Sequence, residues 1–220
     1  VNNTDNVTRG DRDLWDELLQ VVIPKGRNIW AFADDDSEKL NEVGRSFEFF
    51  VLPENNEENV KKAMKDGNFF AASRYYKTTD RVGEFEGDGN VPLVTDIKVD
   101  QKANTITVAT DPTRDCQVIE WIADGKVIAT GNTIDLNDYE EDLGCYIRFQ
   151  MKGSGGVTYS QPFELQYKGR IDKPVPSWAL WFFKTEAGQK FMKFYHSHSF
   201  ALGAFIAEKI RILIEDNIKK

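Results

Sequence analysis

The chain has 220 residues, with 28 basic and 36 acidic side chains and a formal net charge of −8. This length permits one large domain or two small ones, and a 40 % hydrophobic content excludes a wholly disordered or collagen-like chain. The acidic balance argues against a general nucleic-acid-binding protein, which needs a basic surface. Two cysteines are too few for a disulfide-dense secreted scaffold.

No signal peptide and no membrane-spanning segment is visible in the sequence. The chain begins at Val1, and no charged segment followed by an apolar segment comes after it. We therefore expect that a leader has been removed or that the chain belongs to a larger protein. No uninterrupted apolar run reaches the roughly 20 residues that span a bilayer.

The first eighty residues alternate helical and extended patterns. Apolar residues recur at helical spacing from Leu14 to Val22, and Gly26 follows the end of that predicted helix. A second helix is predicted over residues 56–66. Extended segments are predicted at three places: residues 28–33, 46–52 and 68–73. Strand, helix and strand at these short spacings predict a βαβ unit with a parallel sheet.

Residues 81–170 change to short alternating segments separated by turn signals. Six of these segments are predicted as strands: residues 94–99, 105–109, 117–123, 126–130, 146–151 and 158–167. Asp124-Gly125 is a hairpin signal between two of them, and a glycine-rich turn follows at residues 153–156. Strands at this spacing predict an antiparallel β-sandwich.

Residues 171–220 are predicted to form a helical tail after a stiff linker at Pro174 and Pro176. Bulky apolar side chains crowd its first part: Trp178, Leu180, Trp181, Phe182, Phe183, Phe191, Phe194 and Tyr195. Three interpretations stay open. The helices pack on the rest of the chain, they form a homo-oligomer interface, or they lie on a membrane surface, which favours mixed aromatics and lysines.

Three segments of the first region carry a family resemblance. They are Asp13-Leu-Trp-Asp-Glu-Leu-Leu19, the stretch Gly26-Arg-Asn-Ile-Trp-Ala-Phe-Ala-Asp-Asp-Asp-Ser-Glu38, and residues 60–73 with Ala63, Gly67, Phe69 and Phe70. In this order they resemble the later part of the PHP-domain (polymerase and histidinol phosphatase type) phosphoesterases. The resemblance covers about the first third of the chain.

The resemblance implies metal-assisted hydrolysis of a phosphoester substrate in a distorted β/α barrel. Divalent ions such as Zn, Mn or Fe polarise the phosphate and lower the pKa of a bound water. By position, Asp36 matches a late Asp ligand of the family, and Glu38 stands where the family usually has His. The family's other ligands precede this region, so we expect the chain alone to be inactive. The alternative interpretation of residues 34–36 is an acidic loop that caps the following helix.

A second resemblance concerns the later region. Residues 120–128 (EWIADGKVI) and Asp142-Leu-Gly-Cys-Tyr146 resemble the core-Trp strand and the corner of immunoglobulin-like domains. The resemblance implies that Trp121 lies in the core. It also implies that the strands after Cys116 and Cys145 are antiparallel neighbours whose starting ends lie apart. We therefore expect two thiols rather than a disulfide.

His196 and His198 are the two histidines of the chain. Their pattern resembles an early PHP motif, but a metal site needs further ligands, and a polar hinge between two helices is the alternative.

The sequence thus predicts an α+β chain in three parts: a partial PHP-like β/α-barrel segment (1–80), an immunoglobulin-like β-sandwich (81–170) and an aromatic-rich helical tail (171–220). The predicted function is the C-terminal portion of a metal-dependent phosphoesterase with Asp36 and Glu38 as metal ligands. The alternative is a non-catalytic binding module.

Overall fold

The computed structural model describes residues 11–35, 37–76 and 85–165, together with Thr185, Ala187 and Lys190. By its contacts the chain divides into two units, Val1–Arg170 and Ile171–Lys220. Apart from Thr185, Ala187 and Lys190, the predicted helices of the tail lie outside the described residues, as do its aromatic cluster and its histidine pair. The described part of the first unit is α+β with antiparallel sheets, as expected in outline, and has two α-helices, α1 (Asp11–Val22) and α2 (Glu57–Asp66).

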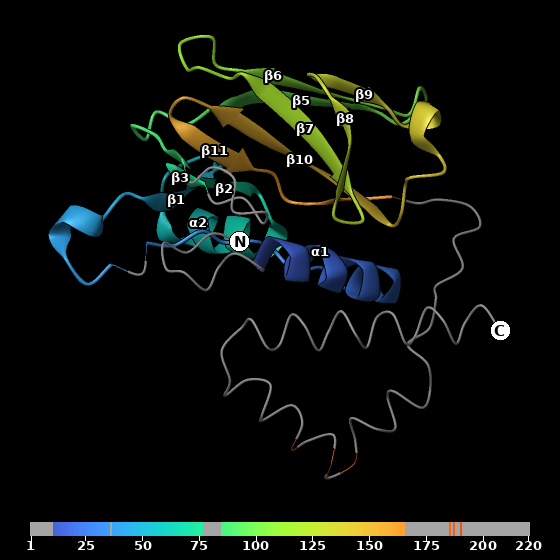
Figure 1. Cartoon of the computed structure of the whole chain (residues 1–220), viewed down its shortest axis with the longest axis horizontal. Helices are drawn as coiled ribbons and strands as arrows, with labels where there is room; N and C mark the ends of the chain where they lie inside the picture. Colours follow the sequence, from blue (N-terminus) through green and yellow to red (C-terminus); the bar gives the residue numbers. More distant parts are fainter. Residues whose placement is uncertain are drawn as a thin grey trace. The chain divides into compact units, whose positions relative to one another are not determined.

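One large sheet runs through the first unit (Figure 1). In spatial order its main strands are β1 (Ser46–Phe50), β2 (Phe69–Ser73), β11 (Gly156–Tyr159), β10 (Tyr146–Gly153), β7 (Val118–Ala123) and β8 (Lys126–Thr130). The short strand β12 (Phe163–Glu164) also pairs with β10. Every pairing in this sheet is antiparallel.

The predicted parallel βαβ unit is wrong. β1 and β2 are antiparallel neighbours, with Ser46 opposite Ser73 and Phe50 opposite Phe69. The chain therefore leaves β1 and enters β2 at the same end of the sheet, and α2 forms part of a long hairpin connection. The backbone N–H of Val51 donates to the carbonyl of Asn68 (2.9 Å) and closes that connection. Strand and helix lengths alone do not distinguish such a hairpin from a crossover.

The strand predicted over residues 28–33 is also wrong: only Ala33 makes an isolated bridge, and side chains bind much of the backbone of this segment. Gln161 accepts from the N–H of Ala31 and donates to its carbonyl, both at 2.9 Å. The indole of Trp15 donates to the carbonyl of Ile29 (2.8 Å), and the N–H of Ala33 donates to Glu48 (2.9 Å). The apolar pattern of this segment reflects burial, since Ala31 and Ala33 are almost fully covered.

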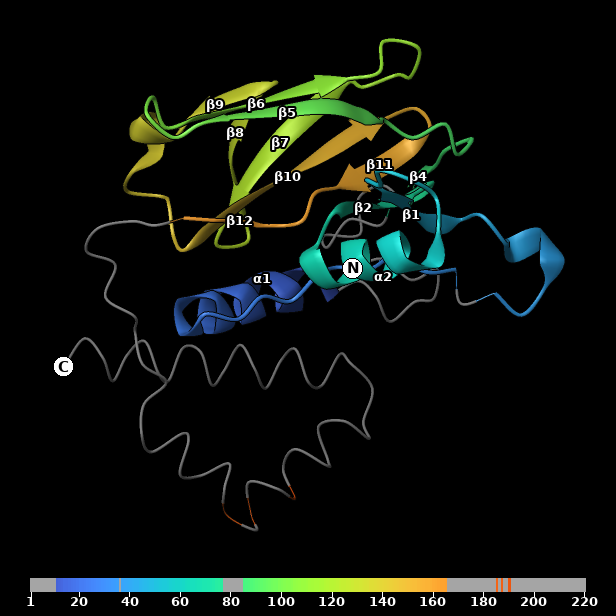
Figure 2. The same ribbon diagram turned by 180° about the vertical axis from the view of Figure 1, so that it is seen from behind.

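A second sheet faces the β7–β10 part of the large sheet (Figures 1 and 2). It contains β5 (Val94–Asp100), β6 (Thr105–Thr110) and β9 (Thr133–Asp135), all antiparallel. Between the sheets lies one apolar core: Ile106, Val108, Ile119, Trp121, Ile134, Ile147, Phe149 and Met151. Trp121 is fully buried as expected, and its indole donates to the carbonyl of Gly131 (2.9 Å).

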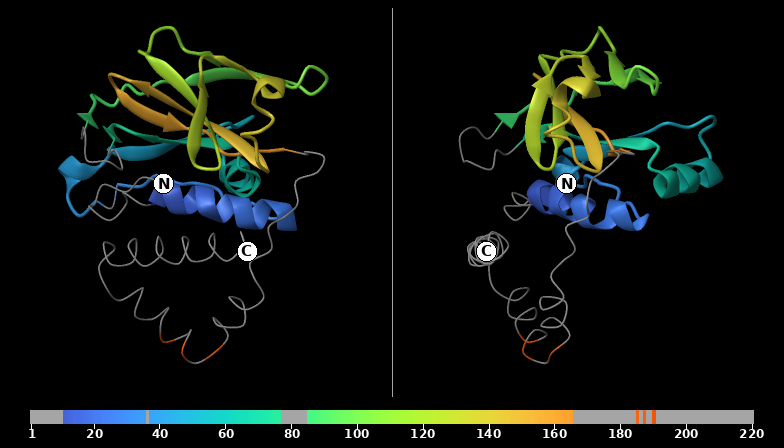
Figure 3. Two further views of the ribbon diagram at one scale, coloured as in Figure 1. Left: turned by 45° about the vertical axis from the view of Figure 1, so that its right-hand side comes forward. Right: turned by 90° about the vertical axis from the view of Figure 1, so that its right-hand side faces the viewer.

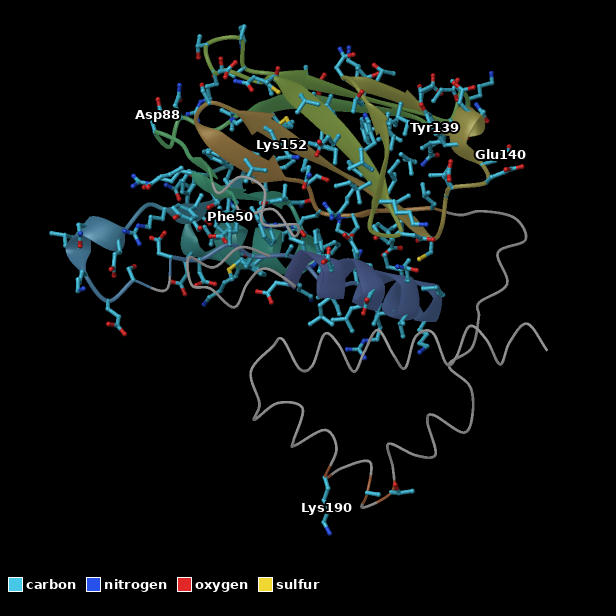
Figure 4. All side chains as sticks on the ribbon, viewed as in Figure 1. Phe50, Asp88, Tyr139, Glu140, Lys152 and Lys190 are labelled. Atoms are coloured by element: carbon cyan, nitrogen blue, oxygen red, sulfur yellow. The ribbon has the colours of Figure 1, made fainter. Side chains whose placement is uncertain are left out.

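Five of the six strands predicted in residues 81–170 are confirmed as single strands. The sixth, residues 158–167, is divided between β11 and β12. Asp124 and Gly125 form the β7–β8 turn, and both have positive φ angles (48° and 77°) as a tight hairpin requires. Across β7 and β10, the labelled Lys152 in Figure 4 pairs with Glu120 (Nζ–Oε2 2.8 Å).

The sheet continues across the expected boundary between residues 80 and 81. β2 pairs with β11, with Ser73 opposite Val157 and Ala71 opposite Tyr159. These four residues are fully buried. The short hairpin of β3 (Tyr75–Tyr76) and β4 (Phe85–Glu86) follows β2. The first strands of the chain and the later strands thus share one hydrogen-bonded sheet.

Helix α1 covers the face of the large sheet that points away from the second sheet (Figure 3). Its buried side, Trp15 and Leu19, packs with Ile23, Cys145 and Tyr146. The helix continues into the short 3-10 turn η2 (Ile23–Lys25) and stops at the left-handed residue Gly26 (φ 70°), as its sequence predicts.

Both cysteines are thiols, as expected. Cys145 is buried under α1, and its Sγ donates to the carbonyl of Leu19 (3.7 Å). Cys116 lies half-buried at the opposite end of the β7–β10 pair, and burial raises the pKa of its thiol. The antiparallel pairing of β7 with β10 separates the residues that precede them, which is the geometry that the resemblance implied.

Candidate functional site

The acidic loop is defined as residues 34–38. It follows segment 29–33, whose backbone is bound by side chains of other segments, and it precedes the 3-10 turn η3 (Leu40–Glu42). Asp34 and Glu38 are exposed, and Asp35 is half-buried. The predicted metal ligand Asp36 lies outside the described residues. The predicted ligand Glu38 is described, and its side chain lies in solvent.

Two carboxylates fix the acidic loop to the sheet. Asp35 accepts hydrogen bonds from the backbone N–H groups of Gly44 (2.7 Å) and Ser46, which begins β1. Glu48, two residues further along β1, accepts from the N–H of Ala33, the residue just before the loop. Asp35 and Glu48 therefore attach the early side of the loop to the edge strand of the large sheet.

A third carboxylate closes the loop from its later side. Glu42 accepts from the backbone N–H groups of Glu38 (3.0 Å) and Lys39 (3.1 Å). This leaves the side chain of Glu38 free of the turn and directed to solvent. The alternative interpretation, in which residues 34–36 cap the following helix, is wrong for Asp35: its carboxylate binds the N–H groups of Gly44 and Ser46, which lie after η3.

Glu48 is the electrostatically perturbed group next to the acidic loop. Burial raises its pKa above the usual range, the hydrogen bond from Ala33 acts in the opposite direction, and the charges of Asp34 and Asp35 raise it further. The ionised form is thus less favoured in the folded chain than in the unfolded chain. The folded state binds more protons in this window, so the contribution of Glu48 to stability falls as pH rises from its unfolded pKa through its folded pKa.

We expect Glu48→Gln to raise the free energy of unfolding at pH 7 and to flatten its decline above about pH 4.5. The amide oxygen of Gln still accepts from Ala33, while the charge beside Asp34 and Asp35 is removed. The gain is below about 1 kcal/mol, since Glu48 is only half-buried and solvent screens its charge. Urea unfolding at pH 5 and pH 7 measures it, with Glu58→Gln on exposed α2 as the control. Equal pH slopes in wild type and Glu48→Gln contradict the assignment.

The described residues do not by themselves make a metal site. In residues 11–35, 37–76 and 85–165, no group of three or more His, Cys, Asp or Glu side chains is placed to hold an ion. Glu38 therefore belongs to no such group among the described residues, and Asp36 lies outside them. His196 and His198 lie outside the described residues.

The sequence did not reveal a buried polar cluster that the described part of the chain contains. Asp16 of α1 binds Arg148 of β10 through two hydrogen bonds, at 2.7 Å to Nε and 2.5 Å to Nη2, and both side chains are at most 4 % exposed. The hydroxyl of Tyr146 donates to the same carboxylate (2.7 Å). The guanidinium also lies over the ring of Trp15, 4.9 Å from its centroid. The sequence did contain one indication of this cluster: the charged residue Asp16 lies next to Trp15, on the side of the helix that is buried.

Electrostatics give this cluster a structural rather than a catalytic character. Burial and the Asp16 carboxylate raise the pKa of Tyr146 well above its usual range. Burial alone acts to lower the pKa of Arg148, but its bonds to Asp16 hold it above the usual value. The phenol therefore stays protonated and the guanidinium charged. The cluster ties α1 to the middle strand of the sheet.

Comparisons with known proteins found no matching protein family, no matching curated protein and no matching solved structure. Within the described part of the chain, no helix is both long and apolar enough to cross a membrane.

Proposed function

We propose that this chain is the C-terminal portion of a PHP-like metal-dependent phosphoesterase, and that its acidic loop contributes Asp36 and Glu38 to a centre of Zn, Mn or Fe. The observation that supports the proposal is that the loop is held on both sides of Asp36: Asp35 and Glu48 attach its early side to β1, and Glu42 binds the backbone N–H groups of Glu38 and Lys39. A metal centre needs ligands that are held in fixed directions, and these three carboxylates fix the backbone from which Asp36 and Glu38 project.

The chemistry of the proposed centre follows from its ligands. Bound divalent ions polarise a phosphoester and lower the pKa of a water molecule. In this chain Asp35 and Glu48 position the loop, and the exposed carboxylate of Glu38 is available to an ion. Because the described residues do not complete a site, the proposed centre takes further ligands from elsewhere, and we expect the 220 residues alone to release no phosphate from a phosphoester.

We expect Asp36→Asn and Glu38→Gln each to lower metal-dependent phosphoester hydrolysis by the natural polypeptide that contains these residues. A lost ligand weakens the ion and its activated water, so the expected loss in kcat/KM is about 100-fold or more. Hydrolysis of p-nitrophenyl phosphate with added Mn²⁺ or Zn²⁺ measures it. The control is Glu58→Gln, a matched loss of one exposed carboxylate on α2.

Three results separate the possible outcomes of this assay. Loss in both loop variants with an active control supports the proposal. Unchanged activity in both variants removes the metal role of the loop. Loss that excess metal restores indicates weakened metal affinity, which also supports a ligand role. Thermal unfolding of each variant shows whether a loss reflects folding instead.

A second candidate function is a non-catalytic binding module. Exposed apolar side chains just after the acidic loop favour it: Leu40 is 91 % exposed and Val43 is 61 % exposed. Figure 1 shows this η3 segment standing away from the sheet. A photo-cross-linking residue at position 40 tests the candidate. If the chain is a binding module, the cross-linker at position 40 is expected to give one discrete adduct with a partner. The same cross-linker at position 58, on α2, is expected to give none.

Oligomerisation or membrane-surface attachment through residues 171–220 stays a prediction, because these positions lie almost wholly outside the described residues. Light scattering tests oligomerisation, and co-sedimentation with lipid vesicles tests attachment to a membrane surface.

A further inference from the structure

Two arginines lie next to each other at one end of the β1–β2 pair. Arg45 immediately precedes β1, and Arg74 immediately follows β2. The backbone N–H of Arg74 donates to the carbonyl of Arg45 (2.9 Å), which extends the β1–β2 ladder by one further pair. Residues that lie opposite each other in an antiparallel pair have neighbouring side chains. Two positive side chains are thus neighbours in a chain whose net charge is −8.

The hydrogen-bonding capacity of these two guanidinium groups is only partly used. Nε of Arg45 and Nε of Arg74 are both covered by the protein, and neither has a hydrogen-bond partner in the described part of the chain. Arg74 forms an ion pair through Nη2 with Glu86 of β4 (2.7 Å). The ion pairs among the described residues include none for Arg45. Buried donors in folded proteins are nearly always paired, so two unpaired Nε–H groups at one place need an explanation.

Hydrogen bonds fix the backbone that carries the two arginines. Ser73 Oγ donates to the carbonyl of Arg45 (3.1 Å) and accepts from the N–H of Tyr75 (3.0 Å). The carbonyl of Arg74 accepts from the N–H of Gly87 (2.7 Å), which follows β4. Figures 1 and 2 show the β3–β4 hairpin beside β1 and β2. The two side chains therefore begin from a rigid part of the sheet.

Arg45 also adjoins the acidic loop. The N–H groups of Gly44 and Ser46, on either side of Arg45, donate to the carboxylate of Asp35. The loop that carries the proposed metal ligands is therefore attached to the backbone at Arg45. Arginines and divalent ions commonly act on the same phosphoryl group, because both neutralise the charge of its oxygens.

We propose that Arg45 and Arg74 together bind the phosphate group of the substrate through N–H donors of both guanidinium groups. A planar guanidinium matches two oxygens of a phosphate, and such bidentate bonds are shorter and stronger than bonds between neutral groups. Both side chains are partly exposed, so a phosphate reaches them from solvent, and a small rotation of each guanidinium turns its Nε–H toward the phosphate. The inference rests on the proposed function for its substrate class, a phosphoester, but the binding of phosphate itself needs no metal.

Titration of the full chain with inorganic phosphate, followed by two-dimensional NMR in EDTA at constant ionic strength, tests the proposal. The wild type is expected to bind phosphate with a dissociation constant on the order of 1 mM. Arg45→Gln/Arg74→Gln is expected to weaken this binding about tenfold or more. The matched control is Lys25→Gln/Arg27→Gln, which removes two exposed positive charges just after α1 and is expected to bind as the wild type does. Equal weakening in the control would show general attraction of anions and overturn the proposal.

A variant that keeps both charges separates a bidentate site from simple attraction. Arg45→Lys/Arg74→Lys loses the planar guanidinium, and we expect it to bind phosphate nearly as weakly as the Gln variant. A wild type that binds no phosphate in the millimolar range overturns the proposal, as does a Lys variant that binds as tightly as the wild type. Circular dichroism shows whether each variant is folded. If loss of Arg74 unfolds the chain, Arg45→Gln and Arg45→Lys alone decide.

The same titration distinguishes this inference from the proposed metal centre. Asp36→Asn/Glu38→Gln is expected to bind phosphate in EDTA as the wild type does, because the two arginines are intact. Phosphate binding that the arginine variants leave unchanged overturns the inference and leaves the metal role of the loop standing. Phosphate binding that depends on Arg45 and Arg74, in a chain whose loop variants lose no metal and no activity, supports the inference and removes the metal role alone.

Discussion

Asp16→Asn is expected to lower the free energy of unfolding by about 3–5 kcal/mol, the usual cost of removing one partner from a buried ion pair. Asp16 is the carboxylate that accepts both hydrogen bonds from Arg148 and a third from Tyr146. Without its charge, the guanidinium stays buried under α1 with no compensating anion. Urea unfolding followed by circular dichroism measures the change.

Two further variants show that the effect comes from the unpaired charge. In Asp16→Leu/Arg148→Met both charges are replaced by apolar groups of similar size, and we expect most of the lost stability to return. Lys62→Gln removes one partner of the exposed Lys62–Asp66 pair on α2, and we expect a change below about 0.5 kcal/mol. A loss below about 1 kcal/mol in Asp16→Asn contradicts the account.

A fragment of residues 82–170 is expected not to fold cooperatively, although the sequence alone marks it as a separate sandwich. Cutting the chain there removes β2, the neighbour of β11, and α1, which covers β10. Val157, Tyr159 and Tyr146, all fully buried in the whole chain, would then face solvent. Each large apolar side chain so exposed costs roughly 1.5–3 kcal/mol, a large share of the stability of a domain this size.

Thermal unfolding and two-dimensional NMR of two fragments test this second prediction. Residues 82–170 should give poorly dispersed amide signals and no cooperative transition. Residues 11–170, which keep α1, β1 and β2, should give dispersed signals and a single transition. A well-folded 82–170 fragment would show that the sheet is divided into two independent units near residue 80.

Local signals in the sequence located most of the elements. Turn residues bounded the later strands well, since Asp124-Gly125 adopts the positive φ angles of a tight hairpin. The C-terminal glycines of both helices were equally informative: Gly26 and Gly67 are left-handed residues after α1 and α2. Each of these features depends on a few adjacent residues, which is why the sequence predicts them.

Pairing between distant segments was not predictable in the same way. The pattern of residues 46–52 and 68–73 fits a parallel or an antiparallel pair, and only the neighbour across the sheet decides between them. Residues 28–33 have the apolar pattern of a buried strand, yet the hydrogen bonds of Ala31 go to the side chain of Gln161, 130 positions away. The register of β2 against β11 likewise joins residues more than eighty positions apart.

In the candidate site, too, the features set by adjacent residues were predicted, and the contacts between distant segments were not. The sequence singled out Asp36 and Glu38 through a family resemblance, and the acidic loop is where such ligands were expected. The positioning roles of Asp35 and Glu48 were not predicted, because each depends on backbone groups of a different segment. In Figure 4 Phe50 is labelled at the end of β1, the same strand that begins at Ser46 beside Asp35 and carries Glu48. That strand therefore links the loop to the sheet that the whole unit shares.

We have proposed that the acidic loop contributes ligands to a metal centre. Metal content of the natural polypeptide that contains these residues, measured by elemental mass spectrometry after purification and gel filtration, tests it most directly. We predict bound Zn, Mn or Fe in the wild type, and a loss of at least one ion per chain in Asp36→Asn/Glu38→Gln but not in Glu58→Gln. An equal metal content in wild type and loop variant, or no bound metal in either, would contradict the claim.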